Sequence, residues 1–186
     1  MPGVNPAFFF TFTEKMATKK DVVASTFYEG YISLAKTGDP LKAIKKNTKD
    51  FKKLLSKIPS KKIDYAYGSD KWTIKETLQH LIDAERVFAY RALRIARKDQ
   101  TALPSFDQDA WAANAQVDTR NWNDLVKEFQ AVRKSTEFLF ASFDKGQLLA
   151  AGTASGNPIN VLGLGFIIAG HAAHHINILE EKYLKG

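Results

Sequence analysis

The last apolar segment of the chain, roughly residues 161–184, is the feature that most limits what this sequence can fold into. It contains three of the four histidines of the protein. At 100° per residue, one stripe of a helix collects Val161, Leu164, Ile168, His171, His175 and Leu179. Two histidines thus occupy positions where the pattern calls for core residues. The i, i+4 spacing of His171 and His175 places both imidazoles on one face, within reach of a single ion.

Three further segments have the periodicity of helices that pack against a core, at about residues 39–58, 73–98 and 121–143. Around the second of them nothing alternates with period two, as a half-buried strand would. We therefore predict an all-α protein whose core is a four-helix bundle.

Local signals mark the ends of these helices. Thr73 and Glu76 have the spacing of a capping box, which satisfies amides of the first helical turn. Pro40 suits a first helical position, and Asn121 and Asn160 are suited to cap the third and fourth helices.

The connections differ in length. Residues 99–120 form a long connection that includes a predicted short helix at about 108–116. This connection is long enough to carry the chain back along the bundle, so the second and third helices need not be antiparallel neighbours. Residues 144–160 are rich in turn-forming residues and are expected to form turns.

The overall composition is that of one ordinary domain with a substantial core. The absence of cysteine excludes disulfides, thiolate metal ligands and a cysteine nucleophile. No apolar run approaches the roughly 18 residues of a membrane span. We expect a cytoplasmic protein without a membrane segment.

The start of the chain lacks a signal-peptide pattern, because no basic residue precedes the run of phenylalanines at residues 8–10. We interpret residues 1–26 as an N-terminal extension and residues 27–186 as the bundle domain. Two readings of residues 1–15 stay open: a disordered extension, or a stretch upstream of a translation start at Met16.

The net charge of +7 is concentrated in one region, because residues 15–62 hold 13 lysines against 4 acidic residues. A basic protein raises the question of nucleic-acid binding. The lysines of the first helix, however, fall opposite its apolar stripe, without interleaved aromatic residues or arginines. A solvated lysine face is therefore the better explanation, and nucleic-acid binding is the weaker alternative.

His80, in the second helix, is the only other histidine and flanks the apolar stripe of that helix. We predict that His80, His171 and His175 converge on one divalent metal ion, which leaves His174 at the periphery or the surface. Three imidazoles without a further protein ligand make an open coordination sphere, as in catalytic sites. Zinc, nickel and ferrous iron all suit such ligands.

Several other motifs are absent. The final helix lacks the glutamate of the zinc-protease HExxH motif. No histidine has a glutamate three residues before it, as a ferritin-like di-iron centre requires. There is no P-loop, no GxGxxG and no GxSxG turn.

The sequence resembles the DinB-like family of metal-binding bundles, which is similar to the bacillithiol and mycothiol S-transferases. The resemblance lies in Lys71–Glu76, in His80–Phe88, in Leu103-Pro104 to Asp109, and in Gly170–His175. It implies an up-down-down-up four-helix bundle and a divalent metal held by His80, His171 and His175. It also implies homodimers.

Two classes of function follow. One is a metal-dependent enzyme of the thiol S-transferase or hydrolase type that acts on a small molecule, in the first case with a low-molecular-weight thiol. The other is a non-catalytic metal-binding stress-response module that acts through protein partners, for which Trp111 and Trp122 are candidate contacts. Four charged residues are candidates to support the site: Asp83, Arg91, Asp107 and Asp109.

Overall fold

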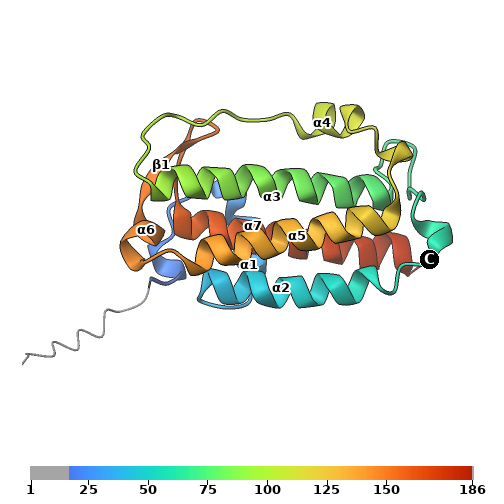
Figure 1. Ribbon diagram of the computed structural model, residues 1–186, viewed down its shortest axis with the longest axis horizontal. Helices are drawn as coiled ribbons and strands as arrows, with labels where there is room; N and C mark the ends of the chain where they lie inside the picture. Colours follow the sequence, from blue (N-terminus) through green and yellow to red (C-terminus); the bar gives the residue numbers. More distant parts are fainter. Residues whose placement is uncertain (1–16, 186) are drawn as a thin grey trace, which may run out of the picture.

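Four long helices form the body of the protein in the computed structural model, which describes residues 17–185. They are α2 (Pro40–Leu55), α3 (Ile74–Ala96), α5 (Trp122–Ala141) and α7 (Val161–Ile178). The helices α2 and α7 run in one direction, whereas α3 and α5 run in the other (Figure 1). This is the up-down-down-up arrangement, and the all-α prediction is confirmed.

The predicted caps are present. The Thr73 hydroxyl accepts a hydrogen bond from the Glu76 amide at 3.1 Å, and the Glu76 carboxylate accepts one from the Thr73 amide at 2.7 Å. The Asn160 side chain accepts from the amide of Gly163 at 2.8 Å. The first long helix, α2, ends earlier than the predicted residue 58.

Shorter elements connect these helices. They are α1 (Glu29–Leu34), α4 (Gln108–Asn114), α6 (Lys145–Leu149), β1 (Ala151–Ala154) and β2 (Asn157–Asn160). Further single turns are η1 (Lys19–Asp21), η2 (Thr26–Tyr28), η3 (Ser60–Lys62) and η4 (Val117–Thr119), and α7 continues into a π-helical segment, η5 (Leu179–Leu184). Of these short elements, the sequence predicted only α4.

A β-hairpin replaces part of the turn region expected at residues 144–160. The strands β1 and β2 pair antiparallel across Ser155 and Gly156, both of which have positive φ, as a two-residue hairpin loop requires. The Leu103 amide donates to the Thr153 carbonyl at 2.9 Å, and the Ser155 amide donates to the Leu103 carbonyl at 2.9 Å. The hairpin thereby anchors the start of the long connection beside α3.

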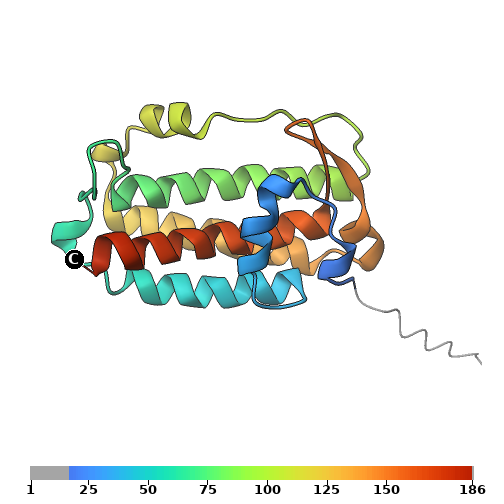
Figure 2. The ribbon, with the colours of Figure 1, turned by 180° about the vertical axis from the view of Figure 1, so that it is seen from behind.

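The segment before α1 packs against the bundle. Ala17 is buried, the Asn160 amide donates to the Val23 carbonyl at 3.0 Å, and the Asn160 side chain donates to the Asp21 carbonyl at 2.8 Å. Part of the stretch assigned to an N-terminal extension therefore contacts the start of α7. Residues 1–16 lie outside the described part of the chain. Figure 2 shows the next element, α1, lying across α7.

The core consists of two apolar clusters along the bundle. One contains Phe88, Phe140 and Phe166, and the other contains Phe51 and Phe129. In sequence, α2, α5 and α7 each place a buried polar residue between their contributions to the two clusters: Asn47, Arg133 and His171. On α3, the buried His80 lies among residues of the second cluster, and the buried Glu85 among residues of the first.

The helix α7 is largely buried, with α1, α2 and α3 packed against it. Together with η5 it is long and apolar enough to cross a membrane by composition alone, contrary to the expectation that no such run exists. Most of it, 72% of the relevant window, is buried inside the protein. Its hydropathy is therefore explained by its burial in the core.

Candidate metal centre

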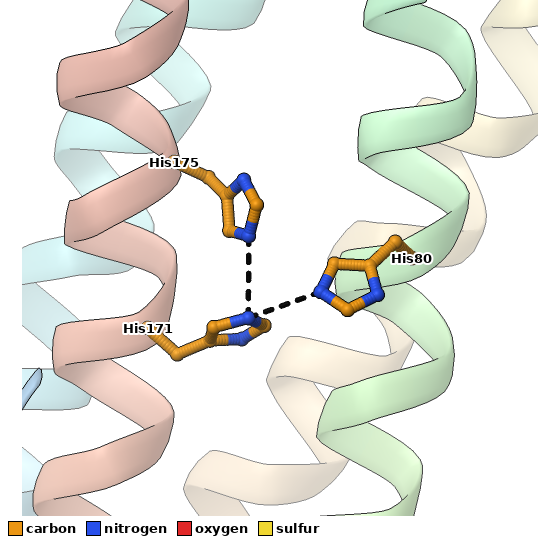
Figure 3. A group of neighbouring side chains, drawn as sticks. All are labelled: His80, His171 and His175. Carbon is orange, nitrogen blue, oxygen red and sulfur yellow. Dashed lines mark hydrogen bonds between the residues drawn. The ribbon is translucent and has the colours of Figure 1, made fainter. Parts of the chain in front are cut away.

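The structure brings His80, His171 and His175 together between two neighbouring helices (Figure 3). His80 comes from the second turn of α3, and the other two come from successive turns of α7. All three side chains are buried, with exposed fractions of 6%, 7% and 9%. The capping box at Thr73 matters here because it sets where α3 begins, two turns before His80.

The ring nitrogens of the three histidines meet closely. The Nε2 atom of His171 lies 3.1 Å from Nε2 of His80 and 3.2 Å from Nε2 of His175. One ligand atom from each residue lies within 4.8 Å of the other two. In a tetrahedral zinc site with Zn–N distances of about 2.0–2.1 Å, two ligand nitrogens are about 3.3 Å apart. The observed separations are close to this value.

Burial keeps the three imidazoles neutral. It lowers the pKa of His80 to about 4. It also lowers the pKa of His175 to about 3, with smaller contributions from His80 and His174. The pKa of His171 is lowered well below its ordinary value by burial, then by the other histidines and by Arg133. Neutral imidazoles are the form that binds metals.

The donor set fits a cation better than a hydrogen-bond network. A neutral imidazole has one N–H donor and one lone pair, so a single hydrogen on Nε2 of His171 can satisfy only one of the two neighbouring nitrogens. A divalent ion among the three rings would accept all three lone pairs at once. Three protein ligands would leave at least one coordination position for a substrate or water.

Aromatic rings surround the histidines. The ring of Tyr31 lies 5.3 Å from that of His171, and the ring of Phe88 lies 5.9 Å from it. The indole of Trp72 packs at 4.7 Å from the ring of His80. Sequence reasoning did not place Tyr31 at the site. The available signal was Gly170, because only a residue without a side chain allows the backbone of α1 to reach α7.

Two pockets of sufficient size for a small molecule reach different members of the histidine group. The larger, about 480 Å³, reaches His80 and His171. Its walls come from the segment around α1, from α3, from the long connection and from the hairpin loop. The smaller, about 180 Å³, reaches His175 and includes Asp70, Lys71 and Asp109. Substrate-sized molecules therefore have room next to the ring nitrogens.

The four charged candidates have different positions. The Asp107 carboxylate caps α4, accepting from the amides of Asp109 and Ala110, and Asp83 accepts a hydrogen bond from Gln79 at 2.9 Å. Burial raises the pKa of Asp83. Asp109 lines the smaller pocket.

Arg91 is buried and donates to the Pro104 carbonyl at 2.6 Å and to the Ser155 hydroxyl at 3.0 Å. It therefore holds the long connection and the hairpin loop together over α3.

His174 lies at the edge of the group, as its helical phase predicted. It is half-buried, and its ring is 5.4 Å from that of Tyr31 and 5.3 Å from that of His175. Trp122 packs against the apolar cluster of Phe51, and Trp111 stacks on Phe106 at 4.8 Å.

Comparison with known proteins agrees with this description. The family model of the DinB superfamily matches residues 43–179, a span that includes all three histidines. Among solved structures, YfiT from Bacillus subtilis, described as a probable metal-dependent hydrolase with an unusual four-helix bundle topology, is similar. The TM-score is 0.68 at 16% sequence identity, and the match covers 76% of this chain and 82% of YfiT.

No curated protein sequence matches the chain. The likeness to YfiT, at its low identity, concerns the fold alone. The family model covers well over half of the chain, from α2 to the end of α7. This chain belongs to the DinB superfamily.

Proposed function

We propose that this protein is a divalent-metal-dependent enzyme of the hydrolase or thiol S-transferase type, in which His80, His171 and His175 hold the ion. The observation that carries the proposal is the convergence of three neutral, buried Nε2 atoms, of residues of which two, His80 and His171, line a pocket of about 480 Å³. The description of YfiT as a probable metal-dependent hydrolase supports the hydrolytic version. Zinc and nickel are the first candidates for the metal, and ferrous iron is the third.

A bound divalent ion would supply Lewis acidity, either polarising a substrate oxygen or lowering the pKa of a water or thiol. The residues of the chain have separate tasks. The histidines fix the position of the ion, and the rings of Tyr31 and Phe88 restrict the motion of His171 through edge contacts. Arg91 fixes the hairpin loop and the long connection, which form two walls of the pocket.

The metal is tested by elemental analysis of the purified protein and of three variants. We expect His80→Ala and His171→Ala to lose most of the bound metal. His174→Ala is the matched control, because it removes an imidazole from the same helix at the edge of the group and should keep the metal. Undiminished metal content in both His80→Ala and His171→Ala would contradict the three-histidine site.

The reaction is tested with two assays on the metal-loaded protein. Hydrolysis of 4-nitrophenyl acetate probes the hydrolase type, and conjugation of 1-chloro-2,4-dinitrobenzene with several small thiols probes the transferase type. We expect metal-dependent turnover in one of them, abolished by His171→Ala. Metal binding without turnover in either assay would argue against an enzyme and for the non-catalytic alternative.

A further inference from the structure

The larger pocket at the histidines has an unusual wall. Five aromatic rings line it, from η2, α1, α3 and the long connection: Phe27, Tyr28, Tyr31, Phe88 and Phe106. The polar groups that accompany them are neutral: Ser25, Gln108, Ser155 and Asn157. Among the lining residues, all within the described part of the chain, there is no aspartate, glutamate, lysine or arginine.

The rings form a continuous path from the surface to the histidines. Phe27 lies edge-on to Tyr28 at 5.1 Å, Tyr28 to Phe88 at 6.5 Å, and Phe88 to His171 at 5.9 Å. Tyr31 joins the path from the other side, edge-on to His171 at 5.3 Å. Such edge-to-face contacts hold the rings in fixed orientations before any ligand arrives.

The outer end of this path is exposed. Phe27 is 74% exposed although it is a large apolar side chain, and it stands at the mouth of the pocket. A single exposed phenylalanine is common on protein surfaces. This one, however, continues a row of rings that leads through the half-buried Tyr28 to the buried Phe88, so a ligand that enters the pocket would cover it.

A positive charge beside two of these rings, that of Arg91, is already engaged in hydrogen bonds. The guanidinium of Arg91 donates to the Pro104 carbonyl and the Ser155 hydroxyl, and it lies about 6.0 Å from the ring of Phe88 and 5.9 Å from that of Phe106. Apart from a metal ion at the histidines, the lining therefore offers a charged ligand no counter-ion for the water that it would lose, which is costly. The smaller pocket at His175, with Asp70, Lys71 and Asp109, has the opposite character.

We propose that the larger pocket binds an uncharged organic molecule through an aromatic ring, with the reacting group directed toward His80 and His171. The inference rests on the proposed function in so far as the ligand is the substrate. The side-chain amide of Gln108 has no hydrogen-bond partner among the described residues, so it is available to orient a carbonyl or hydroxyl group of the ligand.

The test is equilibrium binding of two probes of matched shape to protein from which metal has been removed with a chelator, so that only the lining residues decide the preference. The probes are neutral 2-naphthalenemethanol and anionic 2-naphthalenesulfonate. We expect the neutral probe to bind at least about tenfold more tightly, because the anion finds no counter-charge in the pocket. Equal or tighter binding of the sulfonate would overturn the proposal.

Two variants, at phenylalanines of similar exposure, test where the neutral probe binds. Phe27→Ser removes the ring at the mouth, and we expect it to weaken binding of 2-naphthalenemethanol about five- to tenfold. Phe138→Ser removes a ring of α5 that is 65% exposed and does not line the pocket, so binding should be unchanged. Unchanged binding in Phe27→Ser would contradict the proposed location.

Repeating the titration of the neutral probe on the metal-loaded protein separates this inference from the proposed function. Binding of the neutral probe should be similar with and without metal, because the rings provide the contact. Retained binding in a protein without metal-dependent turnover would leave the pocket inference standing and overturn the enzyme. Metal-dependent turnover without selective binding of the neutral probe would support the enzyme and overturn the pocket inference.

Discussion

The backbone of α7 at Gly170 lies directly against the main-chain carbonyl of Tyr31. A Cβ atom built at Gly170 would come within 1.8 Å of that oxygen, a distance at which α1 would have to move. The contact joins a short helix of six residues to the long, buried helix α7, one residue before His171. It also places the ring of Tyr31 against the rings of His171 and His174.

Replacement of this glycine tests the contact. We expect Gly170→Ala to lower the free energy of unfolding by about 1–3 kcal/mol, because the added methyl group forces a backbone shift in a packed region. Denaturant unfolding followed by circular dichroism measures the loss. Gly30→Ala is the control, since nothing lies within 4 Å of a Cβ at this position and alanine favours a helix. Equal stabilities of the two variants would contradict the close approach.

A buried ion pair gives the second prediction. The carboxylate of Glu85 on α3 lies 2.7 Å from the guanidinium of Arg133 on α5, and the two side chains are 4% and 1% exposed. Arg133→Met would leave the carboxylate buried without a counter-charge, which costs about 3–5 kcal/mol. The double variant Arg133→Met/Glu85→Leu should recover most of this loss, because replacing both partners with apolar residues is often nearly neutral.

The stability that Arg133→Met loses should depend on pH, because the remaining partner, Glu85, can take up a proton. Burial raises the pKa of Glu85, and Arg133 opposes this effect. Without Arg133 the carboxyl is expected to take up a proton more readily, and a protonated carboxyl needs no counter-charge. The loss of stability should therefore be smaller at low pH and grow as pH rises. A loss that is independent of pH, or absent, would show that the pair does not form.

Much of the bundle could be predicted from the sequence, because its signals are local and repeated. The apolar stripe of α3 covers six turns, and the capping box at Thr73 marks its start. The i, i+4 spacing of His171 and His175 follows from helix geometry alone. These features depend on residues close together in the chain, so no tertiary information was needed.

The features that were missed depend on distant partners or on short elements. A helix of six residues and strands of four residues are too short for a periodic pattern to be distinctive, which explains why α1 and the hairpin were not predicted. Glu85 and Arg133 look like surface residues in a sequence, since a charge is buried only when paired. Their pairing comes from helices α3 and α5, which only the fold brings together.

Metal binding should raise the thermal stability of the folded protein. A ligand that binds only the folded state stabilises it, by about 2.7 kcal/mol when its free concentration is one hundred times Kd. We expect the chelator-treated protein to show a higher melting temperature after addition of zinc or nickel. His171→Ala should show no such shift, whereas His174→Ala should behave like the original protein. A shift of equal size in His171→Ala would place the metal elsewhere.

Tyr183, near the end of the chain, gives a prediction at alkaline pH. The side chain is buried, its hydroxyl donates to the Trp72 carbonyl at 2.5 Å, and burial raises its pKa to about 12. In the unfolded chain the hydroxyl has its ordinary pKa of 10.0. The neutral form is thus favoured by folding, so its contribution is fully present below pH 10 and declines as pH rises from 10 toward 12.

Replacing Tyr183 should remove its part of the loss of stability between pH 10 and 12. We expect Tyr183→Phe to be less stable at neutral pH by about 1 kcal/mol, because the Trp72 carbonyl loses its donor. Between pH 10 and 12, however, the difference from the original protein should shrink, since phenylalanine has no proton to lose. Urea unfolding at several pH values measures both effects. A stability difference that stays constant from pH 7 to 12 would show that Tyr183 titrates alike in the folded and unfolded chain.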